Sequence, residues 1–307
     1  MRLNDFILFA VICVSVGLAI LKPETGAALQ PYPLYMMMIL LFLSFLRINF
    51  DSLLDTSFRS LAQLTVLTVV KLIVLPVVLY FVTLQISPDF AIPVLLLSGI
   101  STGVVAPFVA NMVNTDVAPV LRMVVVTSLL TPFTLPTLVE LLVGAQANIP
   151  MAPMIRTLAT VIFIPVALVA VARRWFPRIL EHIGAYQFPI SLGLFFLINL
   201  AVFSKYSKFF FHHWETLFEA IVISYVVGVA YYVAGFIAGH SGVPGARLSA
   251  GISMAIVNNV LVIVFSSQFF GPLAPTLAAM YMFPFFSLLA PLKVLSLRYK
   301  WLGPSKG

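Results

Sequence analysis

The chain has 307 residues, of which 62% are hydrophobic and only 9% are charged. So large an apolar fraction cannot be covered by the surface of a soluble domain, and the composition therefore indicates a membrane protein. The formal net charge of +7 reflects basic residues gathered on one side of the membrane and not a nucleic-acid-binding surface.

Apolar stretches bounded by charged or Pro/Gly-rich loops recur along the chain, and each is close to the length of about 17 to 25 residues that a membrane-spanning helix needs. They are residues 6–21, 32–46, 61–84, 90–113, 118–143, 154–172, 188–203, 217–239, 248–269 and 273–295. The sequence therefore predicts an all-α membrane protein with ten transmembrane helices. Because no long linker interrupts them, we expect a single polytopic membrane domain over 1–307, with a short basic cytoplasmic tail at 298–307.

Basic residues are retained on the cytoplasmic side of membrane proteins. On the side of the amino terminus lie Arg2, Arg47, Arg59, Arg173, Arg174, Arg178, Arg247, Lys293, Arg298, Lys300 and Lys306. The other side carries only Lys22, Arg156, Lys205 and Lys208. We therefore expect both termini in the cytoplasm of a multi-pass protein of the cell membrane, the inner membrane in a bacterium. A cleaved signal peptide is the alternative for the first span.

The third span carries Lys71 near its middle. A charged side chain there costs about 2.5 to 3.5 kcal/mol on insertion scales, so it needs a functional reason and a partner inside the protein. Neither a nearby carboxylate in the sequence nor a helix end offers that partner. The alternative is that Lys71 points elsewhere and reaches the membrane interface or pairs with another group.

The fourth span contains Ser101, Thr102 and Gly103, followed by Pro107. Proline lacks an amide hydrogen and clashes with the preceding turn, so we expect the helix to break over residues 101–107. In lipid, the free carbonyls and amides at a break must be satisfied by ions, substrate or neighbouring side chains. The break is therefore a candidate site, although helix packing or a simple kink is the alternative.

Two further polar residues lie in later spans. Arg122, in the cytoplasmic third of the fifth span, either extends toward phosphate and water or attracts an anionic substrate to an inner vestibule. Asn199, in the seventh span, is a candidate for lining the substrate path, and helix packing explains it equally well. The histidines have no third ligand at metal spacing, so we expect no metal site and no cofactor.

The ninth span is interrupted around Met254, Asn258 and Asn259, whose two carboxamides can replace lost backbone partners. This stretch repeats the fourth span, because Gly251-Ile252-Ser253 follows Gly99-Ile100-Ser101 at a spacing of 152 residues. Matching interruptions in two repeats are the best pointer from sequence to the binding site of a secondary transporter.

The same offset of 152 residues places Pro132-Phe133 on Pro284-Phe285, so the chain reads as two copies of one unit, about 1–145 and about 150–297. An odd number of spans in each copy turns the second copy upside down relative to the first. We therefore expect two inverted five-helix repeats with two broken helices that cross.

Several segments together resemble the bile acid:sodium symporter family. They are 34–53 with Arg47-Ile48-Asn49-Phe50, Lys71 to Pro76, Gly99 to Pro107, Asp116-Val117-Ala118, the region of Pro132, and Ala250 to Leu261. The resemblance implies a fold of ten helices in two inverted repeats, with two helices unwound where they cross and a panel of other helices packed against them. It also implies inward transport of organic anions, coupled to sodium ions bound at the crossing.

The chain departs from that family at the positions that imply sodium binding. Ala106 and Pro107 stand where the family has Ser-Asn, and Val120 and Val124 stand for a Ser and a Thr, so the first sodium site is expected to be absent. In the ninth span Met254 replaces a Glu, while Asn258-Asn259 aligns with a Gln-Asn pair.

Lys71 aligns with a third-span Gln that contributes to the second sodium site. A sodium ion about 4 Å from the ammonium would be repelled by roughly 4 kcal/mol at an effective dielectric constant of 20. We therefore hypothesise that the ammonium occupies the second cation position, held by carbonyls of the ninth-span break and by Asn258 and Asn259. It would be either a permanent internal cation or one that gains and loses a proton.

The sequence thus predicts a secondary transporter of small organic anions that works by alternating access and is sodium-independent or proton-linked. The first alternative is a sodium-coupled symporter of the same family, and a channel or a membrane receptor is the alternative from another class. We expect no enzyme, because neither a His-Glu-x-x-His helix nor a Gly-x-Ser-x-Gly elbow occurs. The expected partners are the anion, the lipid bilayer and a sodium ion or proton, with no nucleic acid, in a monomer or weak homo-oligomer.

Overall fold

The computed structural model describes the chain except for residues 1–2, 47–57, 148–149, 241–244, 290 and 295–307. Its described residues form helices, and their one β-type pairing is an isolated antiparallel bridge between Thr102 and Val257. The segment 47–50, which contributes to the family resemblance, and the basic tail 298–307 lie outside the described residues.

The first half of the chain contains α1 (Leu3–Leu21), α2 (Glu24–Ala27), α3 (Pro33–Phe45), α4 (Phe58–Val69), the π-helical turn η2 (Val70–Val74), α5 (Leu75–Ile86), the short 3₁₀ turn η3 (Pro88–Phe90), α6 (Ala91–Gly99), α7 (Ala106–Met112) and α8 (Val117–Ala147). The second half contains α9 (Met151–Trp175), α10 (Pro177–Lys205), α11 (Ser207–His212), α12 (Trp214–Ala238), α13 (Ala246–Ala255), α14 (Asn259–Phe269), α15 (Leu273–Met280) and α16 (Met282–Ser287).

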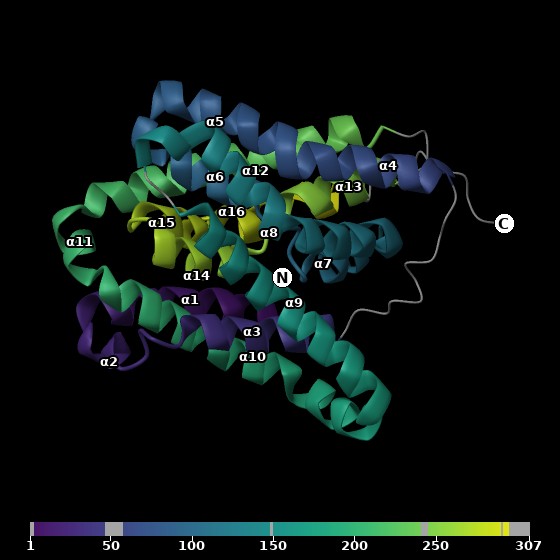
Figure 1. Cartoon of the computed structure of the whole chain (residues 1–307), viewed down its shortest axis with the longest axis horizontal. Coiled ribbons are helices and arrows are strands. Elements are labelled where there is room, and N and C mark those ends of the chain that lie inside the picture. The colour runs from purple at the N-terminus through teal and green to yellow at the C-terminus, as the bar shows by residue number, and fades with distance from the viewer. Residues whose placement is uncertain (1–2, 47–57, 148–149, 241–244, 290, 295–307) are drawn as a thin grey trace.

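The helices form two layers (Figure 1). One layer contains α1, α2 and α3 with α10, and α9 packs against α3. The opposite layer contains α4, α5, α12 and α13, and α14, α15 and α16 lie between the two. Because α14 contacts α3 and α10 on one side and α6 and α15 on the other, it joins the two layers.

The outer face of α12 shows whether this part of the protein is surrounded by lipid or by water. After its first turns, which expose Glu215 and Glu219, its exposed side chains are apolar and follow one another at intervals of three or four residues: Val222, Val226, Val229, Val233 and Ile237. Small and polar residues on the opposite face are buried, and a Cβ on Gly235 would lie 2.5 Å from the Cα of Gly251 in α13. An exposed apolar stripe that continues for more than four turns is favourable in lipid and unfavourable in water.

Within the described residues, six helices are long and apolar enough to cross a membrane: Ser60–Ile86, Val117–Gly144, Met151–Trp175, Tyr186–Lys205, Trp214–Ala238 and Leu273–Val294. The helices Pro33–Phe45, Pro88–Gly99 and Asn259–Phe269 are apolar but shorter. The chain is therefore an all-α, multi-pass membrane protein, while the ten spans and the inverted repeats stay predictions.

Two interruptions were not expected from the sequence. The third predicted span contains the π turn η2, because Pro76 lacks an amide hydrogen and crowds the turn before it. The tenth predicted span changes at Tyr281 from α15 to α16. Both interruptions bear on the site.

Candidate functional site

Two helices are broken, as the sequence predicts. The first break separates α6, which ends at Gly99, from α7, which begins at Ala106. The second separates α13, which ends at Ala255, from α14, which begins at Asn259. We call the two connecting segments, 100–105 and 256–258, the crossing. Both breaks are shorter than predicted, because Pro107 lies in the first turn of α7 and Met254 lies in the last turn of α13.

The two segments of the crossing satisfy each other's backbone. Gly103 N donates to the Ile256 carbonyl at 2.6 Å, and Asn258 N donates to the Ser101 carbonyl at 3.1 Å. This pairing provides partners that neither broken helix offers and that lipid cannot supply. A Cβ on Gly103 would lie 2.7 Å from the Val257 carbonyl oxygen, so the close approach of the two segments requires glycine at this position.

Hydroxyl groups fix Thr102 within the crossing. Its Oγ1 donates to the Ser253 carbonyl at 2.7 Å, and its amide donates to Thr127 Oγ1 of α8 at 3.0 Å. Thr127 Oγ1 in turn donates to the Met123 carbonyl at 2.5 Å. The crossing is therefore tied both to α13 and to α8.

Lys71 lies in the π turn η2, and its side chain is 0% exposed. In this turn the Leu75 amide bonds to the Val70 carbonyl, five residues back instead of four. Such wide turns occur mainly as single turns within α-helices, frequently at functional sites. Lys71 therefore lies within the irregular turn that precedes Pro76, which follows it by five residues.

The Lys71 ammonium contacts the end of α6. Its Nζ donates to the Ser98 carbonyl at 3.1 Å and lies 5.0 Å from the centroid of the Tyr231 ring. The Tyr231 hydroxyl donates to Ser98 Oγ at 2.9 Å. A cation at the C-terminal end of a helix meets the negative end of the helix dipole and an otherwise free carbonyl.

The predicted partners of Lys71 are therefore wrong. The sequence pointed to Asn258 and Asn259 and to carbonyls of the ninth span, and it offered no helix end. The described hydrogen bond instead reaches the last turn of α6, in the fourth span. Asn258 caps α14, where its Oδ1 accepts from Leu261 N at 3.4 Å, and Asn259 Nδ2 donates to Met282 Sδ at 3.0 Å.

The corresponding end of α13 has a neutral cap. The Tyr281 hydroxyl donates to the Ala255 carbonyl at 2.7 Å. Its ring lies 5.7 Å, between centroids, from the ring of Tyr231. One broken helix thus ends on an ammonium and the other on a phenol, and the two tyrosines connect these ends.

Three buried oxygen atoms in or beside the crossing have no described hydrogen-bond partner. They are Ser101 Oγ in the crossing, Asn259 Oδ1 at the start of α14 and Ser128 Oγ in the neighbouring helix α8. Met254, Val120 and Val124 are buried and apolar. Among the described residues, no group of three or more His, Cys, Asp or Glu side chains could hold a metal ion.

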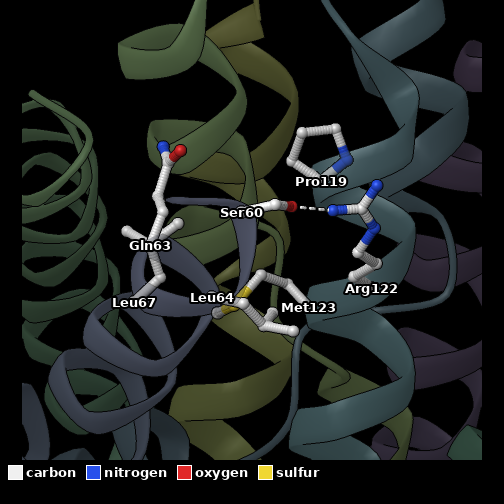
Figure 2. Close-up of a pocket in the computed structure, with 7 residues that line it drawn as sticks. All are labelled: Ser60, Gln63, Leu64, Leu67, Pro119, Arg122 and Met123. Carbon is white, nitrogen blue, oxygen red and sulfur yellow. Dashed lines mark hydrogen bonds between the residues drawn. The ribbon is translucent and has the colours of Figure 1, made fainter. Parts of the chain in front are cut away.

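Arg122 lies at a pocket between α4 and α8 (Figure 2). Its guanidinium donates to Ser60 Oγ across the two helices. The pocket is lined by Ser60, Gln63, Leu64, Leu67, Pro119, Arg122 and Met123. Its cavity volume of about 30 Å³ gives room for about two water molecules.

Asn199 is separate from this pocket. It lies in α10, is 0% exposed, and neither its Oδ1 nor its Nδ2 has a described hydrogen-bond partner. The structure therefore brings Ser101, Thr102, Gly103 and Asn258 together at the crossing, while Arg122 and Asn199 lie elsewhere.

Sequence reasoning missed Ser98, Tyr231, Tyr281, Thr127 and Ser253. Ser98 and Ser253 each lie in the last turn before a break, so their position carried a usable signal. The two tyrosines and Thr127 come from helices that are distant in sequence, and no local pattern places them at the crossing.

A family model described as the sodium bile acid symporter family matches residues 34–213, more than half of the chain. The matched interval includes Lys71, Arg122 and the first break, and it ends before the second. No curated protein matches the chain significantly.

Proposed function

The chain belongs to the sodium bile acid symporter family, and from this premise we propose that it carries small organic anions by alternating access without bound sodium. The proposed site is the crossing, which includes Ser101, Thr102, Gly103 and Asn258, with Pro107, Met254 and Asn259 at its edges. Lys71 is its internal cation. Arg122 and Asn199 line the path.

The observation that carries the proposal is the buried ammonium of Lys71 on the Ser98 carbonyl, at the end of α6. A fully buried charge is expensive in a membrane-spanning segment, and such groups mark ion or substrate pathways. Among the described residues no carboxylate pairs with Lys71, and its described contacts are a carbonyl and an aromatic ring. The positive charge is therefore not neutralised by a described acid.

Sodium binding beside this group is unfavourable. Two positive charges about 4 Å apart repel each other by roughly 4 kcal/mol at an effective dielectric constant of 20. That energy corresponds to about three decades of affinity. The same charge favours an anion, which supports organic anions as the substrate class and a protein amine in place of a dissolved cation.

Alternating access is supported by the two broken helices, because matched breaks in two helices are typical of secondary transporters that work in this way. In this proposal the layer of α1, α3, α9 and α10 moves against the layer that carries the crossing. This motion would act on two inverted repeats, about 1–145 and 150–297, in a cell-membrane protein with both termini in the cytoplasm.

The experiment is uptake of a panel of labelled organic anions into proteoliposomes under a sodium gradient, a proton gradient or neither. We expect saturable uptake that is independent of sodium in the native protein. In Lys71→Gln, uptake without sodium should fall by about tenfold, the equivalent of about 1.4 kcal/mol, and sodium should restore part of it.

Lys205→Gln is the matched control, because Lys205 Nζ also donates to a backbone carbonyl at 3.1 Å but lies at the end of α10. Its uptake should equal that of the native protein. Strong sodium dependence in the native protein would instead establish the sodium-coupled alternative, and large unitary currents would establish a channel.

A further inference from the structure

Asn199 of α10 has a carboxamide that no described residue satisfies. Its side chain is 0% exposed, and neither Oδ1 nor Nδ2 has a described hydrogen-bond partner. A carboxamide contributes one acceptor oxygen and two donor hydrogens. Because an unpaired polar group is unfavourable in a protein interior, each one in a native structure requires an explanation.

Asn199 lies on the face of α10 that is directed at α14. Tyr206 follows Asn199 by seven residues, and seven residues make nearly two full turns of an α-helix, so the two share a face. The Tyr206 hydroxyl donates to the Ser267 carbonyl of α14 at 3.1 Å. Ser204 lies about 140° further around α10, and there a Cβ on Gly26 of α2 would lie 2.6 Å from its Oγ.

The crossing lies at the same height as Asn199 along these helices. Since α10 and α14 pack together and their C-terminal ends are joined by the Lys205 and Tyr206 bonds to Ser267, the two helices run in the same direction. At a rise of about 1.5 Å per residue, Asn199 lies about 10 Å before Tyr206, and Asn259 lies about 12 Å before Ser267. Asn259 is the first residue of α14. Asn199 therefore faces the first turn of α14, next to the crossing and from the opposite layer.

The surroundings of Asn199 on its own helix are apolar. The residues one turn away on the same face are Phe195, Val202 and Phe203, which are all buried. The carboxamide is thus a single neutral polar group within an apolar wall of α10. Ligand sites typically have this composition, because a few polar groups in an apolar wall fix the orientation of the ligand.

We propose that Asn199 is a specificity-determining residue that binds a hydroxyl or amide group of the transported anion. A carboxylate has acceptors only and would leave Asn199 Oδ1 unpaired, whereas a hydroxyl or an amide group has a donor and an acceptor and satisfies both atoms. The substrate is therefore an organic anion with a second, neutral polar group, and its negative charge lies at the crossing. This inference rests on the proposed function, and its test measures binding separately from transport.

The test compares two series of probes that differ only by a terminal hydroxyl group. They are the alkanoates from butanoate to heptanoate and the corresponding ω-hydroxyalkanoates, titrated calorimetrically into the full chain in detergent. We expect one hydroxylated member to bind the native protein about tenfold more tightly than its parent, because the parent leaves the carboxamide unpaired. Absence of any such preference in the native protein would overturn the inference.

Two substitutions of Asn199 assign the preference to its carboxamide. Asn199→Leu removes the polar atoms at similar volume, so it should bind both members of the preferred pair within about twofold of each other. It should also raise the temperature of thermal unfolding, because an unpaired buried group is removed. Retention of the full preference in this variant would contradict the inference.

Asn199→Ser keeps a donor and an acceptor on a shorter side chain. It should retain about a threefold preference and move that preference to a hydroxyalkanoate one carbon longer, because the serine hydroxyl ends nearer the backbone. This variant decides the question if Asn199→Leu does not fold. The same preference at the same chain length as in the native protein would refute a contact between Asn199 and the ligand.

Ser204→Ala is the matched control, because Ser204 is a buried polar residue of the same helix that faces α2. It should keep the native preference and the native chain length. Loss of the preference in this variant would assign the effect to the packing of α10 and overturn the inference.

Uptake of the preferred pair into proteoliposomes separates this contact from the proposed transport. Preferential binding without uptake would support the contact and refute the transport alone. Uptake of both members with the same KM by the native protein would refute the contact alone. Equal loss of uptake for both members in Asn199→Leu would place the partner of Asn199 in another conformation of the chain, which also overturns the inference.

Discussion

Lys71 and Lys205 make nearly the same contacts in two different parts of the molecule. Each Nζ donates to a serine carbonyl at 3.1 Å, that of Ser98 or that of Ser267. Each also lies over a tyrosine ring, at 5.0 Å for Tyr231 and 5.2 Å for Tyr206. In both places the tyrosine hydroxyl bonds to the same serine.

The surroundings of the two lysines differ completely. Lys205 is exposed at the last residue of α10, while Lys71 is 0% exposed within a membrane-spanning segment. The exposed ammonium keeps much of its hydration, whereas the buried one must rely on a carbonyl and a ring. The same local contacts thus stabilise an ordinary helix end at Lys205, whereas at Lys71 they surround a buried charge.

The largest expected effect comes from breaking the crossing that holds the end of α6 in place. Gly103→Ala places a Cβ 2.7 Å from the Val257 carbonyl oxygen. We expect a loss of about 3 kcal/mol in the free energy of unfolding, because overpacking adds to the loss of the paired backbone. Thermal unfolding in detergent measures this loss, which should be accompanied by loss of anion uptake.

Gly193→Ala is the control for that variant, since nothing lies within 4 Å of a Cβ at Gly193 in α10. It should raise stability by about 0.5 to 1 kcal/mol, because alanine favours a helix over glycine. Equal behaviour of the two variants would show that the close approach at Gly103 does not hold the crossing together.

The two tyrosines give the next effect. Tyr231→Phe removes the buried bond to Ser98 Oγ and keeps the ring beside Lys71. We expect a loss of about 1.5 kcal/mol in unfolding free energy, against about 0.5 kcal/mol for Tyr206→Phe at the more accessible site. Thermal unfolding of both variants in one detergent checks the difference, and a larger loss at Tyr206 would refute the role assigned to burial.

Periodicity and composition were sufficient to predict the helical membrane fold. Apolar runs place the helices, and the recurrence of Gly-Ile-Ser located both breaks, with Pro107 after the first and Asn258-Asn259 at the second. The π turn η2 was not predicted, although Pro76 caused it, because a proline in a helix indicates a disturbance without its form. The orientation in the membrane and the inverted repeats stay predictions.

The candidate site was only partly predictable. Lys71 was evident from its charge in an apolar run, because a single buried cation is conspicuous there. Its partner was not, since the choice between Ser98 and Asn258 depends on how the third, fourth and ninth spans pack. Tyr231 and Tyr281 contribute through tertiary contacts alone, and such contacts leave no periodic signal.

The smallest expected change in stability is the most informative about Lys71. Lys71→Met replaces the ammonium by an apolar side chain of similar length. It removes a buried charge that costs about 2.5 to 3.5 kcal/mol and leaves the Ser98 carbonyl unpaired, which costs about 1 to 3 kcal/mol. We therefore expect a net gain of about 1 kcal/mol in unfolding free energy together with a loss of anion uptake. Lys205→Met should leave uptake unchanged and should alter the unfolding free energy by no more than about 0.5 kcal/mol.

This opposition between stability and uptake separates two roles for the buried ammonium. If Lys71 served only to cap α6, its removal would destabilise the protein by the full value of the lost hydrogen bond, and uptake would fall only in proportion to the folded fraction. If it is a functional cation, the folded protein gains stability while uptake per folded molecule falls. Measuring uptake per molecule that remains monodisperse on size exclusion distinguishes the two, since natural sites keep such unfavourable groups where function requires them.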